Sequence, residues 1–473
     1  MRNLVLAFML ALLGAGCTLG PDYVRPDLDM PTAWRVDAAE AKNLADTAWW
    51  GQFGDPVLSG LIDTALKENK DLLIAAARIE EFEGRYGIVR SGLFPQVGAG
   101  ASYSREQITR EAENKPAPGY ATLTESYSTT LNAAWEIDLW GRIRRSTEAA
   151  RAQLLGTEEA RRGVILSLVG DVASAYVNLR GLDRQLEIAR NTVRSREESY
   201  RIFQERYDGG IISLLELTQN KSQYDEALAT IPPIEKAIAQ QENGLSVLLG
   251  HNPGPIPRGL SIEELTLPAV VAGLPSDLLE RRPDVKQAEQ ALVAANAQIG
   301  VAKAAYFPAI SLTGLFGFAS DDLADLFRDS AQAWSYSAPV TMPIFTAGRI
   351  AGNVKAAEAV QRQALAGYRQ AVQNAFREVN DALTDQLQTG RQLAAQDKQV
   401  ASLRQYDEVA RLRYDEGYTD FLTVLDAERS LFNAELSFTQ TRVALHRAMI
   451  GLYKAMGGGW MNTVETSAAT QVQ

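Results

Sequence analysis

The sequence is poor in the residues that most often build cross-linked or metal-bearing sites. Its 473 residues include one cysteine and only two histidines, His251 and His446, which lie far apart in the chain. These counts exclude a disulfide scaffold and a Cys/His zinc cluster. Neither histidine stands in a recognisable catalytic motif, and the chain shows no nucleophile motif and no phosphate-binding loop. We therefore expect no cofactor, no metal and no enzymatic activity.

Positive charge is also scarce. The chain carries 47 Lys and Arg against 58 Asp and Glu, which gives a formal net charge of −11, and it contains no basic block. Because binding to a phosphate backbone depends on a basic surface, this balance argues against nucleic acid as a partner. At 46% hydrophobic and 22% charged residues, the chain is too apolar to be disordered and long enough for several layers or domains.

Long hydrophobic runs are missing after the N-terminus. Arg2 precedes an apolar run, Leu4–Leu13, that is too short to cross a bilayer and is typical of a secretory signal. Cys17 stands where a bacterial lipoprotein signal is cut and acylated, and Thr18 follows it, not the Asp that resembles an inner-membrane retention signal. We predict a signal peptide at 1–16 and lipidation of Cys17. The alternative is ordinary signal cleavage nearby, since Gly14 occupies a position where lipoprotein signals usually carry Leu.

The second half of the chain repeats the first. Three motifs recur in the same order, two at one common offset in residue number and the first at a slightly larger offset. They are Phe94-Pro95 with Phe307-Pro308, Gly141-Arg142-Ile143 with Gly348-Arg349-Ile350, and Arg206-Tyr207-Asp208 with Arg413-Tyr414-Asp415. The difference in offset predicts a longer loop in the first copy, at Glu111–Gly119. The period far exceeds that of solenoid repeats, so we infer a duplication of one supersecondary unit.

Each copy contains two segments in which side chains alternate at every second position. In Thr122–Leu139 most odd positions are apolar and nearly all even positions are polar, and Gln96–Tyr103 alternates in the same way. Copy two shows the pattern at Ile310–Phe318 and at Trp334–Ile344. This period predicts strands with one apolar and one polar face. The pattern fits either a half-buried sheet of a soluble domain or part of a membrane barrel, and the secretion signal favours the barrel.

Two long helical arms follow these strands. Gly141–Tyr207 and its repeat Gly348–Tyr414 lack proline, and each would span about 100 Å as one helix. Gly210 and Gly417 predict turns into return helices, and Pro232-Pro233 predicts a kink in the first of these. Four strands cannot close a membrane barrel, because single-chain barrels need about eight or more. Open sheet edges are not tolerated in lipid, so the chain is expected to oligomerise; the strand count does not by itself set the number of copies.

Six motifs, in this order, carry a resemblance that extends over nearly the whole chain. They are Gly16–Tyr23, Trp49–Pro56, Trp135–Arg142, Gly273–Asp284, Leu425–Leu431 and Tyr453–Trp460. With them the chain resembles the TolC-type outer-membrane factors, specifically the OprM-like lipoprotein branch that serves tripartite efflux systems of the RND type. The resemblance implies an α+β membrane protein with a trimeric 12-stranded β-barrel, four strands coming from each chain. A long α-helical barrel and a mixed equatorial domain continue it.

The resemblance also implies a function and a set of partners. The chain would be the outer-membrane channel of a tripartite efflux pump, conducting drugs or other small toxic compounds to the exterior. Its partners would be two further copies of itself, a periplasmic adaptor (membrane fusion) protein, an inner-membrane RND-type transporter and outer-membrane lipid. Its location would be the outer membrane, with a periplasmic extension. The alternatives are a type I secretion conduit for proteins, which has the same fold, and a structural periplasmic lipoprotein.

The repeats and motifs together predict a domain organisation. The expected segments are a signal peptide (1–16), a lipidated and equatorial segment (17–70), repeat one (71–250), an equatorial linker (251–283), repeat two (284–456) and a tail (457–473). Each repeat would hold a helix, two strands and a long helical hairpin. The linker and the N-terminal segment would together form the equatorial part.

Candidate functional residues cluster near the turns between arms and return helices. The turn residues Gly210, Ile211, Gly417 and Tyr418 are predicted to dock the adaptor, although a plain interhelical turn would look the same. Leu422, Asp426 and Arg429 share one helix face, and they match residues that close the pore in OprM-like channels. Tyr414 matches a tyrosine that ties neighbouring helices there. The alternative for Asp426 and Arg429 is an ordinary exposed ion pair.

The two copies differ at this gate. The positions of copy one that correspond to Leu422, Asp426 and Arg429 are Leu215, Gln219 and Ser222, so both charges are missing there. We therefore expect only one hairpin of each chain to carry the lock. Three Asp426 carboxylates around a symmetry axis would favour cations, with Arg429 offsetting their repulsion.

Overall fold

A computed structural model describes residues 18–28, 49–109, 122–267 and 278–458. The predicted signal peptide, Cys17, the Glu111–Gly119 loop and the part of the tail after residue 458 lie outside the described residues. The chain divides into two compact units. The strand unit comprises the described residues of 18–27, 78–157 and 287–368, and the hairpin unit comprises the other described residues. Each unit therefore contains parts of both sequence repeats.

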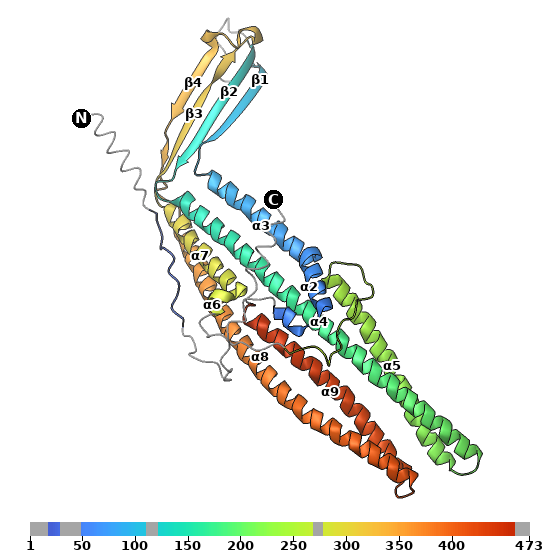
Figure 1. Cartoon of the computed structure of the whole chain (residues 1–473). Coiled ribbons are helices and arrows are strands. Elements are labelled where there is room, and N and C mark those ends of the chain that lie inside the picture. The colour runs from blue at the N-terminus through green and yellow to red at the C-terminus, as the bar shows by residue number, and fades with distance from the viewer. Residues whose placement is uncertain (1–17, 29–48, 110–121, 268–277, 459–473) are drawn as a thin grey trace. The chain divides into compact units, whose positions relative to one another are not determined.

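The strand unit is built on one antiparallel sheet (Figure 1). Its strands are β1 (Gln96–Gln107), β2 (Leu123–Ile137), β3 (Ala309–Ser320), β4 (Gln332–Ser337) and β5 (Val340–Thr341). The order is β1-β2-β3-β4, and β5 pairs with β3 beyond β4. Pro339 separates β4 from β5, because proline has no N–H to donate to a ladder. The two strands predicted for each copy are thus confirmed, the fourth being interrupted at this proline.

Strand pairing is the same in both copies. Val97 lies opposite Ala133 in copy one, and Ile310 lies opposite Val340 in copy two. Val97 and Ile310 are separated by the same offset as the two Phe-Pro motifs, and Ala133 and Val340 by the same offset as the two Gly-Arg-Ile motifs. The duplication therefore extends to the register of the strands.

The apolar positions share one face of the sheet. Trp135 lies opposite Leu312 there, and Leu131 lies opposite Phe316. The paired part of β2, from Tyr127 to Ile137, has the length that a tilted strand needs to cross the apolar layer of a bilayer, about 9–11 residues.

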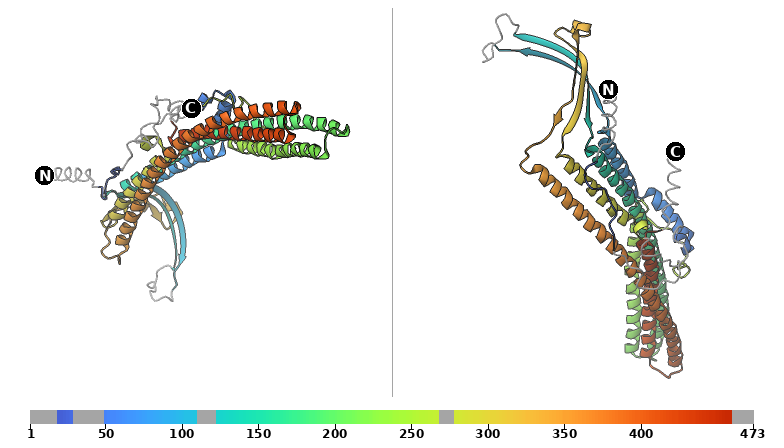
Figure 2. Two further views of the ribbon diagram at one scale, coloured as in Figure 1. Left: turned by 90° about the horizontal axis from the view of Figure 1, so that it is seen from below. Right: turned by 90° about the vertical axis from the view of Figure 1, so that its left-hand side faces the viewer.

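The helices reproduce the duplication with the same lengths. Helices α3 (Lys70–Ser91) and α7 (Pro283–Ala304) precede the first strand of each copy and have 22 residues each. The arms α4 (Arg142–Asp208) and α8 (Arg349–Asp415) have 67 residues each. The return helices α5 (Leu214–Leu248) and α9 (Phe421–Ala455) have 35 residues each. In Figures 1 and 2, α5 runs beside the end of α4, and α9 runs beside the end of α8.

Local signals explain where these helices begin. The carboxylate of Asp138 accepts hydrogen bonds from the N–H groups of Ile143 and Arg144, at 2.9 and 2.8 Å, and so caps the first turn of α4. Pro283 starts α7, where its missing N–H costs nothing. Pro232 and Pro233 do not end α5, which continues through them; the kink there stays a prediction.

The main core of the hairpin unit surrounds a short segment near the start of the described chain. Here η1 (Trp49–Phe53) and α2 (Pro56–Glu68) pack against the middle of α4 and the end of α9. The ring of Trp49 stacks on Tyr453, with centroids 5.0 Å apart, and Phe53 lies 5.8 Å from His446. The short helix α6 (Leu278–Arg281) precedes α7. Because Trp49 and Phe53 are buried in this core, the Trp49–Pro56 motif of the sequence is a packing motif.

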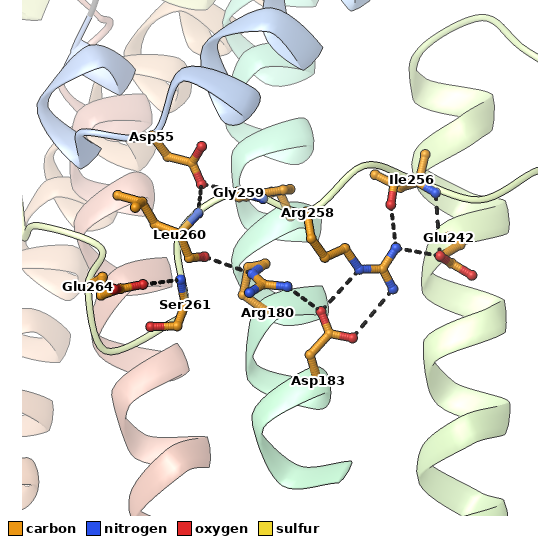
Figure 3. A network of polar contacts seen from close by, with 11 residues as sticks. Asp55, Arg180, Asp183, Glu242, Ile256, Arg258, Gly259, Leu260, Ser261 and Glu264 are labelled. Carbon is orange, nitrogen blue, oxygen red and sulfur yellow. Dashed lines mark hydrogen bonds and ion pairs between the residues drawn. The ribbon is translucent and has the colours of Figure 1, made fainter. Parts of the chain in front are cut away.

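Buried polar contacts join this core to the loop that follows α5 (Figure 3). Asp55 caps α2 through the N–H of Val57, and the same carboxylate accepts from the hydroxyl of Tyr176 at 2.7 Å and from the N–H of Leu260 at 3.0 Å. Arg258 extends the network by donating to Asp183 at 3.1 Å. These contacts fix the loop on α4 through residues that are distant in sequence.

Candidate channel gate and hairpin tips

Both hairpins turn through the same backbone motif. In copy one the N–H of Gly210 donates to the carbonyl of Tyr207 and the N–H of Ile211 to that of Arg206, at 2.9 and 2.8 Å. Copy two repeats these contacts from Gly417 to Tyr414 and from Tyr418 to Arg413, at 2.9 and 2.8 Å. This is the Schellman arrangement, which requires a left-handed residue after the helix. Gly210 and Gly417 supply it, with φ of 71° and 78°.

Helix caps stabilise the end of each turn, where the return helix begins. The hydroxyl of Ser213 and the carboxylate of Glu216 form a capping box at the start of α5. The carboxylate of Asp420 accepts from the N–H of Thr423 at the start of α9. Ile211 and Tyr418, the residues that follow the turn glycines, are both largely exposed. Each tip is thus a turn fixed by backbone and cap hydrogen bonds, and a large apolar or aromatic side chain is exposed directly after its glycine.

The predicted gate residues share a face of α9, as expected. Leu422, Asp426 and Arg429 are all about half exposed, and the Arg429 guanidinium donates to the Asp426 carboxylate at 3.0 Å. They line a cleft of about 390 Å³ together with Gln219 and Ser222 of α5. Those two are the copy-one equivalents of Asp426 and Arg429, so the fold brings the charged and the uncharged versions of one motif face to face.

Tyr414 of α8 packs against a different face of α9, the one that carries Phe421. Its ring is 5.2 Å from that of Phe421, and both pack against Phe203 of α4, which is 4.3 Å from Phe421. Burial raises the pKa of the Tyr414 hydroxyl, and the nearby Arg206 opposes this shift. These three rings belong to a small core near the tips that also contains Leu217 of α5. Tyr414 therefore connects the arm of copy two to the arm of copy one within the chain.

Sequence reasoning missed a cluster of charges in which Arg196 is buried and Glu428 is largely buried, on a different face of α9 from the gate residues. Arg411 of α8 pairs with Glu428 of α9 at 2.8 Å and with Asp407 at 3.2 Å. Burial raises the pKa of Glu428, which Arg411 opposes. Burial lowers the pKa of Arg196, which lies over the ring of Phe432 and donates to the carbonyl of Gln223 at 2.7 Å. The spacing of Phe421, Leu425, Glu428 and Phe432 on α9 was the available signal, because it marks a second buried face.

The polar face of the sheet carries small and hydroxyl side chains. Ser102 and Ser128 are joined across β1 and β2 by a 2.8 Å hydrogen bond, and Thr313 and Ser337 across β3 and β4 by one of 2.6 Å. At the end of β2, Arg142 forms a paired contact with Glu136 at 2.7 and 3.0 Å. These charges therefore lie near the strand end and pair with each other.

None of the helices in the described ranges is both long and apolar enough to cross a membrane. Within the same ranges, no group of three or more His, Cys, Asp and Glu side chains is arranged to hold a metal ion.

Comparison with known proteins shows the family. A family model described as outer membrane efflux protein matches residues 61–251 and 274–458. The toluene efflux pump outer membrane protein TtgF of Pseudomonas putida is 37% identical over 476 residues, covering 98% of each chain. The cation efflux system protein CusC of Escherichia coli is 37% identical over 462 residues, covering 96% of this chain and 98% of CusC.

Solved structures agree. The outer-membrane channel OprN superposes with a TM-score of 0.85 at 32% identity, covering 94% of this chain and all of OprN. The open state of the MtrE outer membrane channel of Neisseria gonorrhoeae gives 0.85 at 32%, covering 94% of this chain and 98% of MtrE. The predicted fold class, a trimeric β-barrel continued by a helical barrel, and the predicted outer-membrane location are confirmed. The chain belongs to the outer membrane efflux protein family and is the outer-membrane channel of an efflux system.

Proposed function

We propose that three copies of this chain form a channel that is closed at its periplasmic end by Leu422, Asp426 and Arg429, and that the channel releases small toxic organic compounds. A periplasmic adaptor docks on the hairpin tips, and an inner-membrane RND-type transporter supplies the compounds. The observation that carries the gate is the cleft shared by Asp426, Arg429, Gln219 and Ser222, because it places the charges on an exposed face of α9.

Three symmetry-related copies of this face would form a ring around the channel axis. Half-exposed Asp426 and Arg429 keep part of their hydrogen-bonding capacity for a neighbouring copy. Leu422 adds an apolar side chain one helical turn earlier on the same face. An exposed ion pair within one helix contributes about 0.3–0.5 kcal/mol, too little to explain the pair as a stabilising device. A role at the constriction accounts better for charges that copy one lacks.

The polar face of the sheet supports a cargo of mixed chemistry. If it lines the lumen, hydroxyl groups such as those of Ser128 and Thr313 meet the cargo, together with charged pairs such as Glu136 with Arg142. Pore walls select ions mainly through rings of charge, so a wall of hydroxyl groups does not discriminate strongly between small compounds. The choice of which compounds are exported then depends on the inner-membrane transporter.

The gate is tested by single-channel conductance in planar bilayers. We expect Asp426→Ala together with Arg429→Ala to raise conductance and to sensitise cells to large antibiotics. Gln219→Ala together with Ser222→Ala, in the same cleft, is the matched control and should leave both unchanged. Unaltered conductance in the first variant, with the trimer intact, would place the constriction elsewhere.

A further inference from the structure

Both long arms begin with the same local structure. A glycine with positive φ, 75° at Gly141 and 84° at Gly348, comes directly before each arm. The first residue of each arm is an exposed arginine, Arg142 in α4 and Arg349 in α8. The isoleucine that follows each arginine is buried. Arg142 and Arg349 therefore occupy the same position in two copies of one structure.

In copy one this arginine is neutralised. Its guanidinium forms a paired contact with the Glu136 carboxylate, at 2.7 and 3.0 Å. The next arginine of α4, Arg144, lies 3.3 Å from the carboxylate of Asp138, which also caps the helix. Arg142 and Arg144 thus each have an acidic partner within the chain.

Copy two keeps the arginine and lacks its partners. At the common offset, Pro343 stands in the place of Glu136. Phe345 stands in the place of Asp138 in the same way. The first turn of α8 holds no acidic residue, and the guanidinium of Arg349 has no hydrogen bond or ion pair among the described residues. A positive charge at the start of a helix is also unfavourable, because that end of the helix dipole is itself positive. Within the described structure, the charge of Arg349 is therefore uncompensated.

The duplication places Arg349 at the end of the polar face of the sheet. Thr341 on β5 is the copy-two equivalent of Ala134 on β2, because the offset of the Gly-Arg-Ile motifs separates them. Ala134 lies opposite Thr313, and Thr341 lies opposite Ala309. These two partners are an even number of positions apart on β3, so both pairs lie on the polar face, to which Thr313 belongs. Arg349 therefore follows Thr341 as Arg142 follows Ala134.

Charge is scarce on this polar face. In the described strands its charged side chains are Glu136, which Arg142 neutralises, and Glu106 at the opposite end of the sheet. The other positions of the face carry hydroxyl, amide or small side chains, with one leucine. Arg349 thus adds a positive charge at the arm end of the face that no acidic side chain of this face balances.

We propose that Arg349 is a specificity-determining residue that biases the channel toward anionic compounds. Three copies would place three guanidinium groups around the lumen where the sheet meets the arms. Rings of like charge select ions in pores, so this ring attracts organic anions such as carboxylates and repels organic cations. The bias rests on the proposed channel, because the polar face must line its lumen.

Cysteines at the two matched positions of the polar face measure the local charge. Thr341→Cys and Ala134→Cys are each treated, in the purified detergent-solubilised trimer, with a small thiosulfonate reagent that is either anionic or cationic. The parent protein, whose one cysteine is Cys17, gives the background. The ratio of the anionic to the cationic rate should be higher at Thr341→Cys. Arg349→Gln should lower that ratio roughly four-fold in dilute salt, since a charge within about 8 Å changes each rate about two-fold.

Copy one supplies the matched control. Arg349→Gln should leave the ratio at Ala134→Cys unchanged. Arg142→Gln should lower the ratio at Ala134→Cys, because it leaves the Glu136 carboxylate without its partner. Arg349→Lys keeps the charge and should keep the parent ratio at Thr341→Cys. Salt at about 1 M should remove the differences, because charges are then screened beyond about 3 Å.

The reversal potential of single channels in a salt gradient tests the consequence for conduction. Arg349→Gln should shift it toward the value of a cation-selective channel, and Arg349→Lys should not. A ratio at Thr341→Cys that Arg349→Gln leaves unchanged, or an unshifted reversal potential in a trimeric protein, would overturn the bias alone. If neither cysteine reacts with either reagent in the trimer, the polar face does not line a water-filled lumen, and the proposed channel is wrong together with the bias.

Discussion

The ring of Phe203 on α4 lies 4.3 Å from the ring of Phe421 on α9, and this contact joins the two hairpins of one chain near their tips. Both side chains are buried, and Phe421 directly precedes the proposed gate residue Leu422. The face of α9 proposed to close the channel and the face that is held by copy one are thus adjacent, and Leu425 belongs to both. Because Phe421 and Leu422 are consecutive residues of α9, we expect movement of the proposed gate to shift or break this aromatic contact.

Removing the Phe203 ring should loosen the gate without touching it. Phe203→Ala leaves a cavity in a small core, a change that costs about 3–5 kcal/mol in well-packed proteins. We expect higher single-channel conductance and greater leakage of large antibiotics. Phe203→Leu should restore most of the closed behaviour, and Tyr207→Ala, at the partly exposed repeat position of Tyr414, should have little effect. Normal conductance of a trimeric Phe203→Ala protein would contradict this role.

The buried His446 should make the hairpin unit sensitive to acid. Burial lowers its pKa from 6.5 to about 4, with a smaller contribution from Arg442, and its Nδ1 has no hydrogen-bond partner among the described residues. The unfolded chain therefore binds a proton between pH 6.5 and 4 that the folded chain does not. The free energy of unfolding is therefore highest above pH 6.5, the pKa of His446 in the unfolded chain. It decreases as the pH drops toward about 4, the pKa of His446 in the folded chain, by an amount on the order of 3 kcal/mol.

Thermal unfolding in detergent measures this effect. In the parent protein, the midpoint temperature of unfolding should decrease as the pH is lowered from about 7.5 to about 4.5. The decrease should be smaller in His446→Leu. The difference between the two proteins is the relevant quantity, because other groups also titrate in this range. Equal falls in both proteins would show that His446 does not contribute.

The N-terminus should be Cys17 carrying lipid. A lipid chain and an inserted barrel together give stable anchoring, and the signal segment is too short to span the membrane. The intact mass of the detergent-purified protein should exceed that of residues 17–473 by the acyl groups. Cys17→Ser should remove this added mass. A different first residue, or a mass without addition, would refute lipidation at this position.

The hairpin tips should contact a periplasmic partner. Photo-reactive residues placed at Ile211 or Tyr418, which are exposed beside the turn glycines, should capture the adaptor in native cells. A probe at Leu323, in the exposed connection between β3 and β4, is the control and should not capture it. Capture from Leu323 and none from the tips would reverse the proposed orientation of the chain in the membrane.

Much of the architecture could be predicted from local patterns. The signals were local: the alternation in Thr122–Leu139, the absence of proline from the arms, and the glycines at the turns. The duplication allowed each signal to be checked in both copies. The predicted arm Gly141–Tyr207 agrees with α4 to within a residue at each end. The interruption of the fourth strand could also be anticipated from Pro339, although the periodic pattern hides it.

The gate was only partly predictable. The helical spacing places Leu422, Asp426 and Arg429 on one face, because the period of the α-helix sets that face regardless of context. It could not show that Gln219 and Ser222 lie across the cleft from them, since that depends on how α5 packs beside α9. Nor could it show that Tyr414 packs against Phe421 and does not line this cleft.

The sequence by itself determined the repeat, the lengths of the helices and the faces of the strands, because these follow from periodicity and from turn and cap residues that act locally. Only the tertiary structure decided which charges are buried. Glu428 and Arg196 look like ordinary surface residues of a charged helix, and Asp55 looks like a simple helix cap. Packing removes their side chains from water and joins Asp55 to Tyr176 and Leu260, which are distant in the chain. Such contacts depend on the meeting of distant segments, which no local pattern encodes.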